Sequence, residues 1–128
     1  MKYLSLAVAA LLGLTAATNS TRNIWIDPET RSLRDAEDRH VIFHGVNVVY
    51  KVPPYYPEDN TFEPTKSLTG KDMDDLQKWG LNFVRLGVMW ESVETAPGVY
   101  DQDYLDHIDK VITELGQRGI YTLVDAHQ

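Results

Sequence analysis

The sequence has 128 residues, of which 43% are hydrophobic and 24% charged, which is typical of one globular domain or part of one and argues against a disordered chain. Its formal net charge of -7 argues against a nucleic acid or an anionic membrane as the main partner, because both require a basic surface. There is no cysteine, so the fold must rely on a hydrophobic core rather than on disulfides.

Residues 1–17 have the pattern of a secretory signal peptide. The positive start Met1-Lys2 precedes an apolar run from Leu4 to Leu14, and small residues follow it, so we expect cleavage after Ala17. The apolar run is too short to span a membrane. We therefore predict that the protein is secreted or resides in the lysosomal or endomembrane lumen.

A short segment, residues 18–23, is expected between the signal peptide and the folded part, which we predict to run from residue 24 to residue 128. Asn19-Ser20-Thr21 matches the N-glycosylation sequon, although such triplets also occur by chance and this one lies close to the cleavage site. Asn19 is therefore the candidate glycosylation site.

The first part of the predicted fold contains two strands. Residues 24–26 form a short strand that ends in a turn with Pro28 at its second place. Residues 31–40 are strongly charged and are expected to form a surface hairpin or a solvated connecting loop, of which we favour the connecting loop. Residues 41–50 follow as a strand that is apolar on both faces, in which Gly45 indicates a bend or a close approach of two backbones.

A long loop is predicted over residues 51–65. Its four prolines exclude a helix, and a loop of this length is usually functional or disordered. Because it also carries Tyr55, Tyr56 and Phe62, we expect an ordered wall rather than a flexible linker.

Two helices and two further strands complete the pattern. Ser67 or Thr69 caps a helix that runs to Trp79 and ends at Gly80, and Asp101 or Asp103 caps a second helix that ends at Gly116 and Gly119. The apolar residues of each helix recur on one face. In the first helix they are Met73, Leu76 and Trp79; in the second they are Tyr104, Leu105, Ile108, Val111, Ile112 and Leu115.

The two strands, residues 81–90 and 120–128, read as buried on both faces, with a loop and a Pro-Gly turn over residues 90–100. Arg85 lies within the first of them, where its guanidinium must find an acceptor or a wet cavity. The order of strands and helices gives two successive βαβ units and a parallel sheet with right-handed crossovers. Three strands and two helices cannot cover both faces of this sheet, so the sequence looks truncated.

Four motifs in this order resemble those of glycoside hydrolase family 5. They are Phe43-His44-Gly45-Val46-Asn47, Gly80-Leu81-Asn82-Phe83-Val84-Arg85-Leu86, Trp90-Glu91 with residues 96–101, and Asp125-Ala126-His127-Gln128. The tract from Lys51 to Pro57 is similar to the endoglycoceramidase branch. The resemblance implies that residues 24–128 are the N-terminal part of a (β/α)8 barrel, with about three strands, two helices and an N-terminal hairpin.

The resemblance also implies a retaining hydrolase that cleaves between the glycan and the ceramide of a glycosphingolipid. Such enzymes need two carboxyl groups about 5–5.5 Å apart. In the family these are glutamates at the ends of the fourth and seventh strands, which we expect to lie beyond Gln128, so the chain alone should be inactive. Glu91 and Glu94 are rejected as substitutes because the family does not use this loop, and Asp125 is not placed to be the nucleophile.

The remaining site residues are supporting ones by the same resemblance. Arg85 would orient the nucleophile carboxylate, or alternatively pair with any carboxylate of the barrel. His127 would line the sugar subsite, and Lys51 and Asp125 would bind sugar hydroxyls or else form ion pairs. Asn47 and Trp90 are weaker candidates, and Trp90 could equally belong to the core.

No metal or other cofactor is predicted. The histidines at positions 40, 44 and 107 are not spaced as a metal site, and His107 is expected to face solvent from its helix. The predicted partner is a glycan or glycosphingolipid, with the lipid surface that carries it. Two alternatives stay open: a secreted, non-catalytic half-barrel that binds sugar or lipid, and a family 5 polysaccharide hydrolase such as an endoglucanase.

Overall fold

The structure is a computed structural model that describes residues 24–128. The expected signal peptide, residues 18–23 and the sequon at Asn19 lie outside this described part. The chain divides into two units, of which the first is described over residues 24–41 and the second comprises residues 42–128. No helix in the described part is long and apolar enough to cross a membrane.

The first unit is a small antiparallel hairpin of β1 (Trp25–Ile26) and β2 (Leu33–Arg34). The turn between them is organised by Asp27, whose carboxylate accepts hydrogen bonds from Glu29 N, Thr30 Oγ1 and Arg34 Nε. The hydroxyl of Thr30 and then these other donors lower the pKa of Asp27 to about 2. The charged segment thus contributes β2 to a hairpin, and the solvated connecting loop that we favoured for it is wrong.

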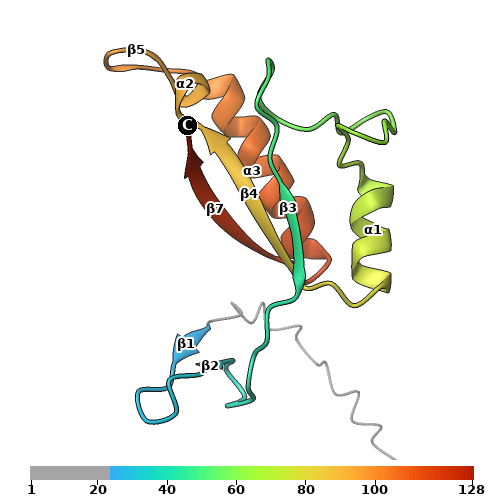
Figure 1. The fold of residues 1–128 in the computed structure, drawn as a ribbon, viewed down its shortest axis with the longest axis vertical. Coiled ribbons are helices and arrows are strands. Elements are labelled where there is room, and N and C mark those ends of the chain that lie inside the picture. The colour runs from blue at the N-terminus through green and yellow to red at the C-terminus, as the bar shows by residue number, and fades with distance from the viewer. Residues whose placement is uncertain (1–23) are drawn as a thin grey trace, which may run out of the picture. The chain divides into compact units, whose positions relative to one another are not determined.

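The second unit contains a parallel sheet in the order β3 (Gly45–Val48), β4 (Phe83–Met89), β7 (Tyr121–His127) (Figure 1). Asn82, just before β4, ties the segment that leads into β3 to the sheet, because its side chain accepts a hydrogen bond from His44 N and donates one to the carbonyl of Ile42. Its backbone carbonyl also accepts from Tyr121 N. The two predicted βαβ units are confirmed.

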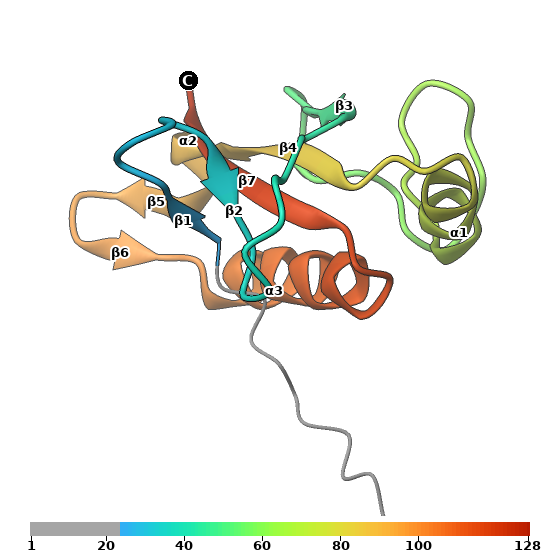
Figure 2. The same ribbon diagram turned by 90° about the horizontal axis from the view of Figure 1, so that it is seen from below.

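The helices α1 (Gly70–Lys78) and α3 (Gln102–Gln117) begin at the predicted caps, Thr69 and Asp101. Thr69 and Asp72 form a reciprocal capping box. Figures 1 and 2 show α3 running along one face of the sheet. The core comprises Leu68, Met73, Leu76, Val84, Leu86, Tyr104, Ile108, Val111, Leu115 and Ile120.

Four predictions about these elements are wrong in part. The strand expected over residues 41–50 is only four residues long and mostly exposed, because in the described part β3 pairs on one side only, with β4. Trp79 follows α1 as its C-cap and is 68% exposed, so it does not join the buried face of α1. Gly116 lies within α3, and Gly119, with φ +76°, follows the helix instead.

The fourth correction concerns residues 90–100, which are not a simple loop. They form the short helix α2 (Trp90–Val93) and a hairpin of β5 (Glu94–Ala96) and β6 (Val99–Tyr100). The predicted Pro-Gly turn lies between the two strands, where Gly98 has φ +74°. Gly98 N donates to the carboxylate of Glu94 at 2.7 Å, which helps to close this turn.

Candidate active site

The sheet of the second unit has two different faces. Along β4 the side chains alternate: Val84, Leu86 and Val88 pack in or against the core, so Arg85 lies on the opposite face. The parallel register places Asn47 and Leu123 beside Arg85, and Asp125 beside Gly87. The prediction of a strand buried in apolar surroundings on both faces therefore holds for the core face only.

An ion pair and a hydrogen bond share one carboxylate oxygen on this second face. Arg85 Nη2 lies 2.7 Å from Asp125 Oδ2, and His127 Nδ1 lies 2.8 Å from the same oxygen. The three side chains are 37%, 23% and 20% exposed, so the cluster is partly open to solvent. Asp125 is therefore the acceptor that Arg85 requires, and the role of Arg85 toward a catalytic carboxylate stays a prediction.

The position of this cluster is set by strand direction. Asp125 and His127 are the fifth and seventh residues of β7, so they lie toward its carboxyl end. At the other end of the same face, Phe43 stacks on Phe83 with ring centroids 4.6 Å apart, and Tyr121 meets Phe43 edge to face. Aromatic rings thus fill the amino-terminal end, and charged groups occupy the end at which (β/α)8 barrels place their active sites.

Three other candidates lie on β3 or just after the ends of β3 and β4. Lys51 is exposed and follows the end of β3, and Trp90, 52% exposed, follows the end of β4. The exposure of Trp90 argues against its being a core residue. Asn47 is exposed and in register with Arg85.

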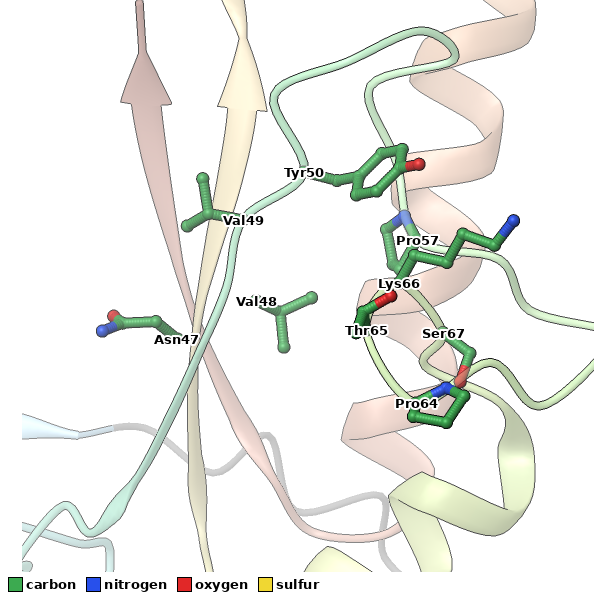
Figure 3. A pocket seen from close by; sticks show the side chains of 9 residues that line it. All are labelled: Asn47, Val48, Val49, Tyr50, Pro57, Pro64, Thr65, Lys66 and Ser67. Carbon is green, nitrogen blue, oxygen red and sulfur yellow. The ribbon is translucent and has the colours of Figure 1, made fainter.

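A hollow of about 180 Å³ lies between β3 and the loop that follows it (Figure 3). Figure 3 shows Val48 pointing toward this loop, whereas Asn47 points to the opposite side of the strand. The hollow is lined mainly by the loop residues Pro57, Pro64, Thr65, Lys66 and Ser67. Asn47, Val48, Val49 and Tyr50 complete the lining, which includes none of the cluster residues Arg85, Asp125 and His127.

The proline-rich loop is anchored to the edge by tyrosines. The buried hydroxyl of Tyr104, on α3, accepts from Met89 N at 3.1 Å and donates to the carbonyl of Tyr55 at 3.3 Å. Partial burial and then the Glu91 carboxylate raise the pKa of Tyr55, and burial raises that of Tyr104.

A second anchor joins the loop to α3 further along the helix. The ring of Tyr56 stacks on His107 with centroids 3.7 Å apart, and Lys110 Nζ lies 2.6 Å from Asp59 Oδ2. The hydrogen bond from Lys110 lowers the pKa of Asp59. The prediction of a solvent-facing His107 is wrong, because its ring is half-buried under Tyr56.

These anchors were not identified from the sequence. Tyr104 belongs to the apolar stripe of its helix, so its periodicity indicated only a core residue. The contacts of Tyr55 and Tyr56 join residues about fifty positions apart, which no local pattern reveals. The expectation of an ordered aromatic wall agrees with what the structure shows.

The family model described as cellulase (glycosyl hydrolase family 5) matches residues 35–128. The chain belongs to glycosyl hydrolase family 5. This match spans the sheet, the helices and the whole cluster of Arg85, Asp125 and His127.

The chain is also similar in sequence to curated endoglycoceramidases. The chain is 37% identical over 128 residues to an endoglycoceramidase of Cyanea nozakii, an alignment that covers 98% of this chain and 25% of the relative. It is 40% identical over 105 residues to an endoglycoceramidase of Hydra vulgaris, which covers 82% of this chain and 20% of that one. The chain thus spans about a quarter or less of the length of these two relatives.

Solved structures of the same kind share the fold. Endo-glycoceramidase II from Rhodococcus sp. in its ganglioside GM3 complex has a TM-score of 0.57 and 33% sequence identity, covering 76% of this chain and 20% of that chain. The crystal structure of an endogalactoceramidase has a TM-score of 0.56 and 28% identity, covering 71% of this chain and 20% of that chain. The fold class is therefore confirmed as α/β and part of a (β/α)8 barrel.

Proposed function

We propose that this chain contributes the supporting side of the active site in a retaining glycoside hydrolase that releases the glycan of a glycosphingolipid from its ceramide. The observation that carries the proposal is the cluster of Arg85, Asp125 and His127 toward the carboxyl edge of a parallel sheet. Membership of family 5 and the likeness to endoglycoceramidases support the reaction and the substrate class.

The chemistry of the cluster suits binding and orientation. Asp125 holds Nδ1 of His127 and so orients the imidazole, while Nε2 of His127 is buried without a hydrogen-bond partner within residues 24–128. Arg85 uses Nη2 toward Asp125, which leaves other N–H groups of its fork for a second acceptor such as the nucleophile carboxylate. Lys51 and Trp90 would contact the glycan from the ends of β3 and β4.

Residues 24–128 supply neither the general acid nor the nucleophile in this proposal. A retaining glycosidase requires two carboxylates on either side of the scissile bond. Glu94 accepts a hydrogen bond from Gly98 N and so helps to hold the turn between β5 and β6. The purified 128-residue chain is therefore expected to be inactive toward a fluorescent glycosphingolipid, and turnover by that chain would contradict this assignment.

The protein would act on a substrate carried by a lipid surface, after entering the secretory pathway. The test is to express the full-length protein and supply a fluorescent glycosphingolipid in detergent micelles. We expect an intact oligosaccharide and free ceramide as products, detected by mass spectrometry. Release of single monosaccharides, or no cleavage at all, would refute the proposal.

A second candidate, a polysaccharide hydrolase, is favoured by the description of the matching family model as cellulase. Carboxymethyl cellulose supplied to the same preparation separates the two. Hydrolysis of this polymer without cleavage of the glycosphingolipid would favour the second candidate. Saturable binding of glycan or lipid without hydrolysis of either substrate would instead favour a non-catalytic binding module.

A further inference from the structure

The hydroxyl of Tyr104 lies buried where three parts of the second unit meet. Tyr104 is 4% exposed, and its hydroxyl accepts a hydrogen bond from Met89 N at 3.1 Å and donates one to the carbonyl of Tyr55 at 3.3 Å. Met89 is the last residue of β4, Tyr55 belongs to the proline-rich loop, and Tyr104 lies in α3. Burial raises the pKa of Tyr104, so at neutral pH the hydroxyl keeps the proton that it donates.

The start of α3 fixes the backbone of Tyr104. Asp101, the N-cap, accepts a hydrogen bond from Tyr104 N at 2.9 Å, and Asp101 N donates to the carbonyl of Val93 at the end of α2. The side chain of Tyr104 belongs to the core of the unit. The hydroxyl is therefore presented from a well-held helix, and the two backbone groups that it contacts depend on it for their hydrogen bonds.

Each of these two backbone groups lies close in the chain to a candidate glycan contact. Trp90 directly follows Met89. On the other side, Tyr55 N donates to Val52 O at 2.7 Å, which closes a tight turn, and Lys51 directly precedes this turn. One hydroxyl thus joins the segment that carries Lys51 to the segment that carries Trp90.

We propose that Tyr104 is a positioning residue whose hydroxyl sets the place of Lys51 relative to Trp90 at the carboxyl edge of the sheet. This inference rests on the proposed function, in which both side chains contact the glycan. Two contacts that are already held in place lose less conformational freedom when the glycan binds, and binding is tighter for that reason. Tyr104 acts only through its two hydrogen bonds, because its side chain is buried.

The second anchor keeps the rest of the loop in place independently of Tyr104. Tyr56 on His107 and Asp59 on Lys110 hold the middle of the loop to α3. Tyr104→Phe keeps the aromatic ring in the core and removes only the hydroxyl, so it should free the turn after Lys51 while the loop stays attached. Substrate affinity should change more than the rate of the chemical step, because the reacting groups stay in place.

The experiment compares Tyr104→Phe in the full-length protein with two control variants. Tyr100 is 60% exposed on β6, so Tyr100→Phe removes a tyrosine hydroxyl without consequence. Ile108 lies in the core one turn further along α3, so Ile108→Val lowers stability but leaves the hydrogen bonds of Tyr104 intact.

Four quantities are measured on each protein. They are Tm, KM and kcat for a fluorescent glycosphingolipid, the rate of tryptic cleavage after Lys51, and hydrogen exchange of the peptide that contains the Met89 amide. The last two report on the two hydrogen bonds of the hydroxyl without depending on activity.

We expect Tyr104→Phe to raise KM on the order of tenfold, which corresponds to about 1.4 kcal/mol, with kcat within about twofold of wild type. Cleavage after Lys51 and exchange at Met89 should both become several-fold faster. Ile108→Val should lower Tm and leave KM unchanged, and Tyr100→Phe should match wild type in every measurement.

Three results would overturn the inference. The first is cleavage after Lys51 and exchange at Met89 at the wild-type rates in Tyr104→Phe, which would show that the hydroxyl holds neither segment. The second is an unchanged KM in Tyr104→Phe, or a rise in KM that Ile108→Val reproduces, which would leave only a contribution to stability. The third is failure of Tyr104→Phe to fold, since the hydroxyl would then serve the whole fold.

Failure of the proposed function gives a different result. If the wild-type protein cleaves no glycosphingolipid, the proposed function is wrong. Proteolysis after Lys51 and exchange at Met89 then decide by themselves whether the hydroxyl of Tyr104 joins the two segments.

Discussion

Gly45 offers a sharp test of how the sheet is built, because a single methyl group cannot be accommodated there. A Cβ atom added at Gly45 would overlap the carbonyl oxygen of Phe83 and lie 2.5 Å from its carbonyl carbon. Both atoms belong to the backbone of the neighbouring strand β4, with which Gly45 is in register. The φ of Gly45 is not left-handed, so space rather than backbone conformation requires the glycine.

The size of the effect follows from how far the strands must separate. Ordinary van der Waals contact begins at 3.4 Å, so the carbonyl carbon of Phe83 and the new methyl must move apart by 0.9 Å or more. Ladder hydrogen bonds lose most of their strength with such a displacement. Loss of two of them, at about 0.5–1.5 kcal/mol each, together with the remaining overlap predicts a destabilisation of about 3 kcal/mol for Gly45→Ala.

Two other glycines provide graded controls. At Gly87 an added Cβ would meet the side chain of Val49, with its two methyl groups at 2.9 and 3.0 Å, and this side chain can move, so we expect a cost of about 1 kcal/mol. At Gly116, inside α3, it would meet nothing within 4 Å. Gly116→Ala should stabilise the protein by about 0.5–1 kcal/mol, because alanine loses less conformational entropy in a helix.

The assay is urea denaturation of the purified protein and its three variants, followed by tryptophan fluorescence. Hydrogen exchange at the amides of Val46 and Val48 would report on the β3–β4 ladder directly. We expect the order Gly116→Ala, wild type, Gly87→Ala, Gly45→Ala from most to least stable. A free energy of unfolding for Gly45→Ala within about 0.5 kcal/mol of wild type would refute the reasoning, since it would show that the two backbones are not this close.

Three further predictions concern single side chains. Asn82→Ala removes hydrogen bonds with His44 N and Ile42 O and should lower the free energy of unfolding by about 1–3 kcal/mol. Asn82→Asp keeps the acceptor for His44 N and should lower the free energy of unfolding by less. Equal losses for the two variants in urea denaturation would contradict this. Arg85→Lys in the full-length protein should lower kcat/KM on the order of 100-fold with little change in Tm, because lysine lacks the guanidinium fork. The control Arg118→Lys lies away from the cluster and should leave activity unchanged. Parallel losses of rate and Tm in Arg85→Lys would instead favour a purely structural Arg85. The Asp27 carboxyl should titrate near pH 2 by NMR, and its pKa should rise in Thr30→Val. Because the pKa in the folded state is lowered, the contribution of Asp27 to stability is present above about pH 4 and is lost as the pH falls toward 2. An unchanged pKa in Thr30→Val would show that the hydroxyl is not the cause.

Local patterns in the sequence were sufficient for the regular elements. The caps at Thr69 and Asp101, the apolar stripe of α3 and the two strands around Arg85 and Asp125 all lie where period and composition predict them. The close approach at Gly45 was also indicated by a lone glycine in a strand. These features depend on residues within a few positions of one another, so the sequence carries them directly.

Elements shaped by distant contacts were predicted less well. The segment after Trp90 carries the expected Pro-Gly turn, but its short helix and hairpin gave no periodic signal because each is only two to four residues long. Trp79 repeats at the helical spacing of Met73 and Leu76, yet it caps the helix and is exposed. A residue at the end of a helix can leave the face that periodicity assigns to it.

In the candidate site, too, the sequence predicted some features and only the structure showed others. The sequence by itself determined that Arg85 needs an acceptor and that Asp125 and His127 lie toward the end of a parallel strand. Only the tertiary structure decided that one oxygen of Asp125 meets both Arg85 and His127, and that the hydroxyl of Tyr104 holds the carbonyl of Tyr55. The physical reason is that strand register and loop anchoring join residues far apart in the chain, whereas periodicity and capping act within one or two turns of the backbone.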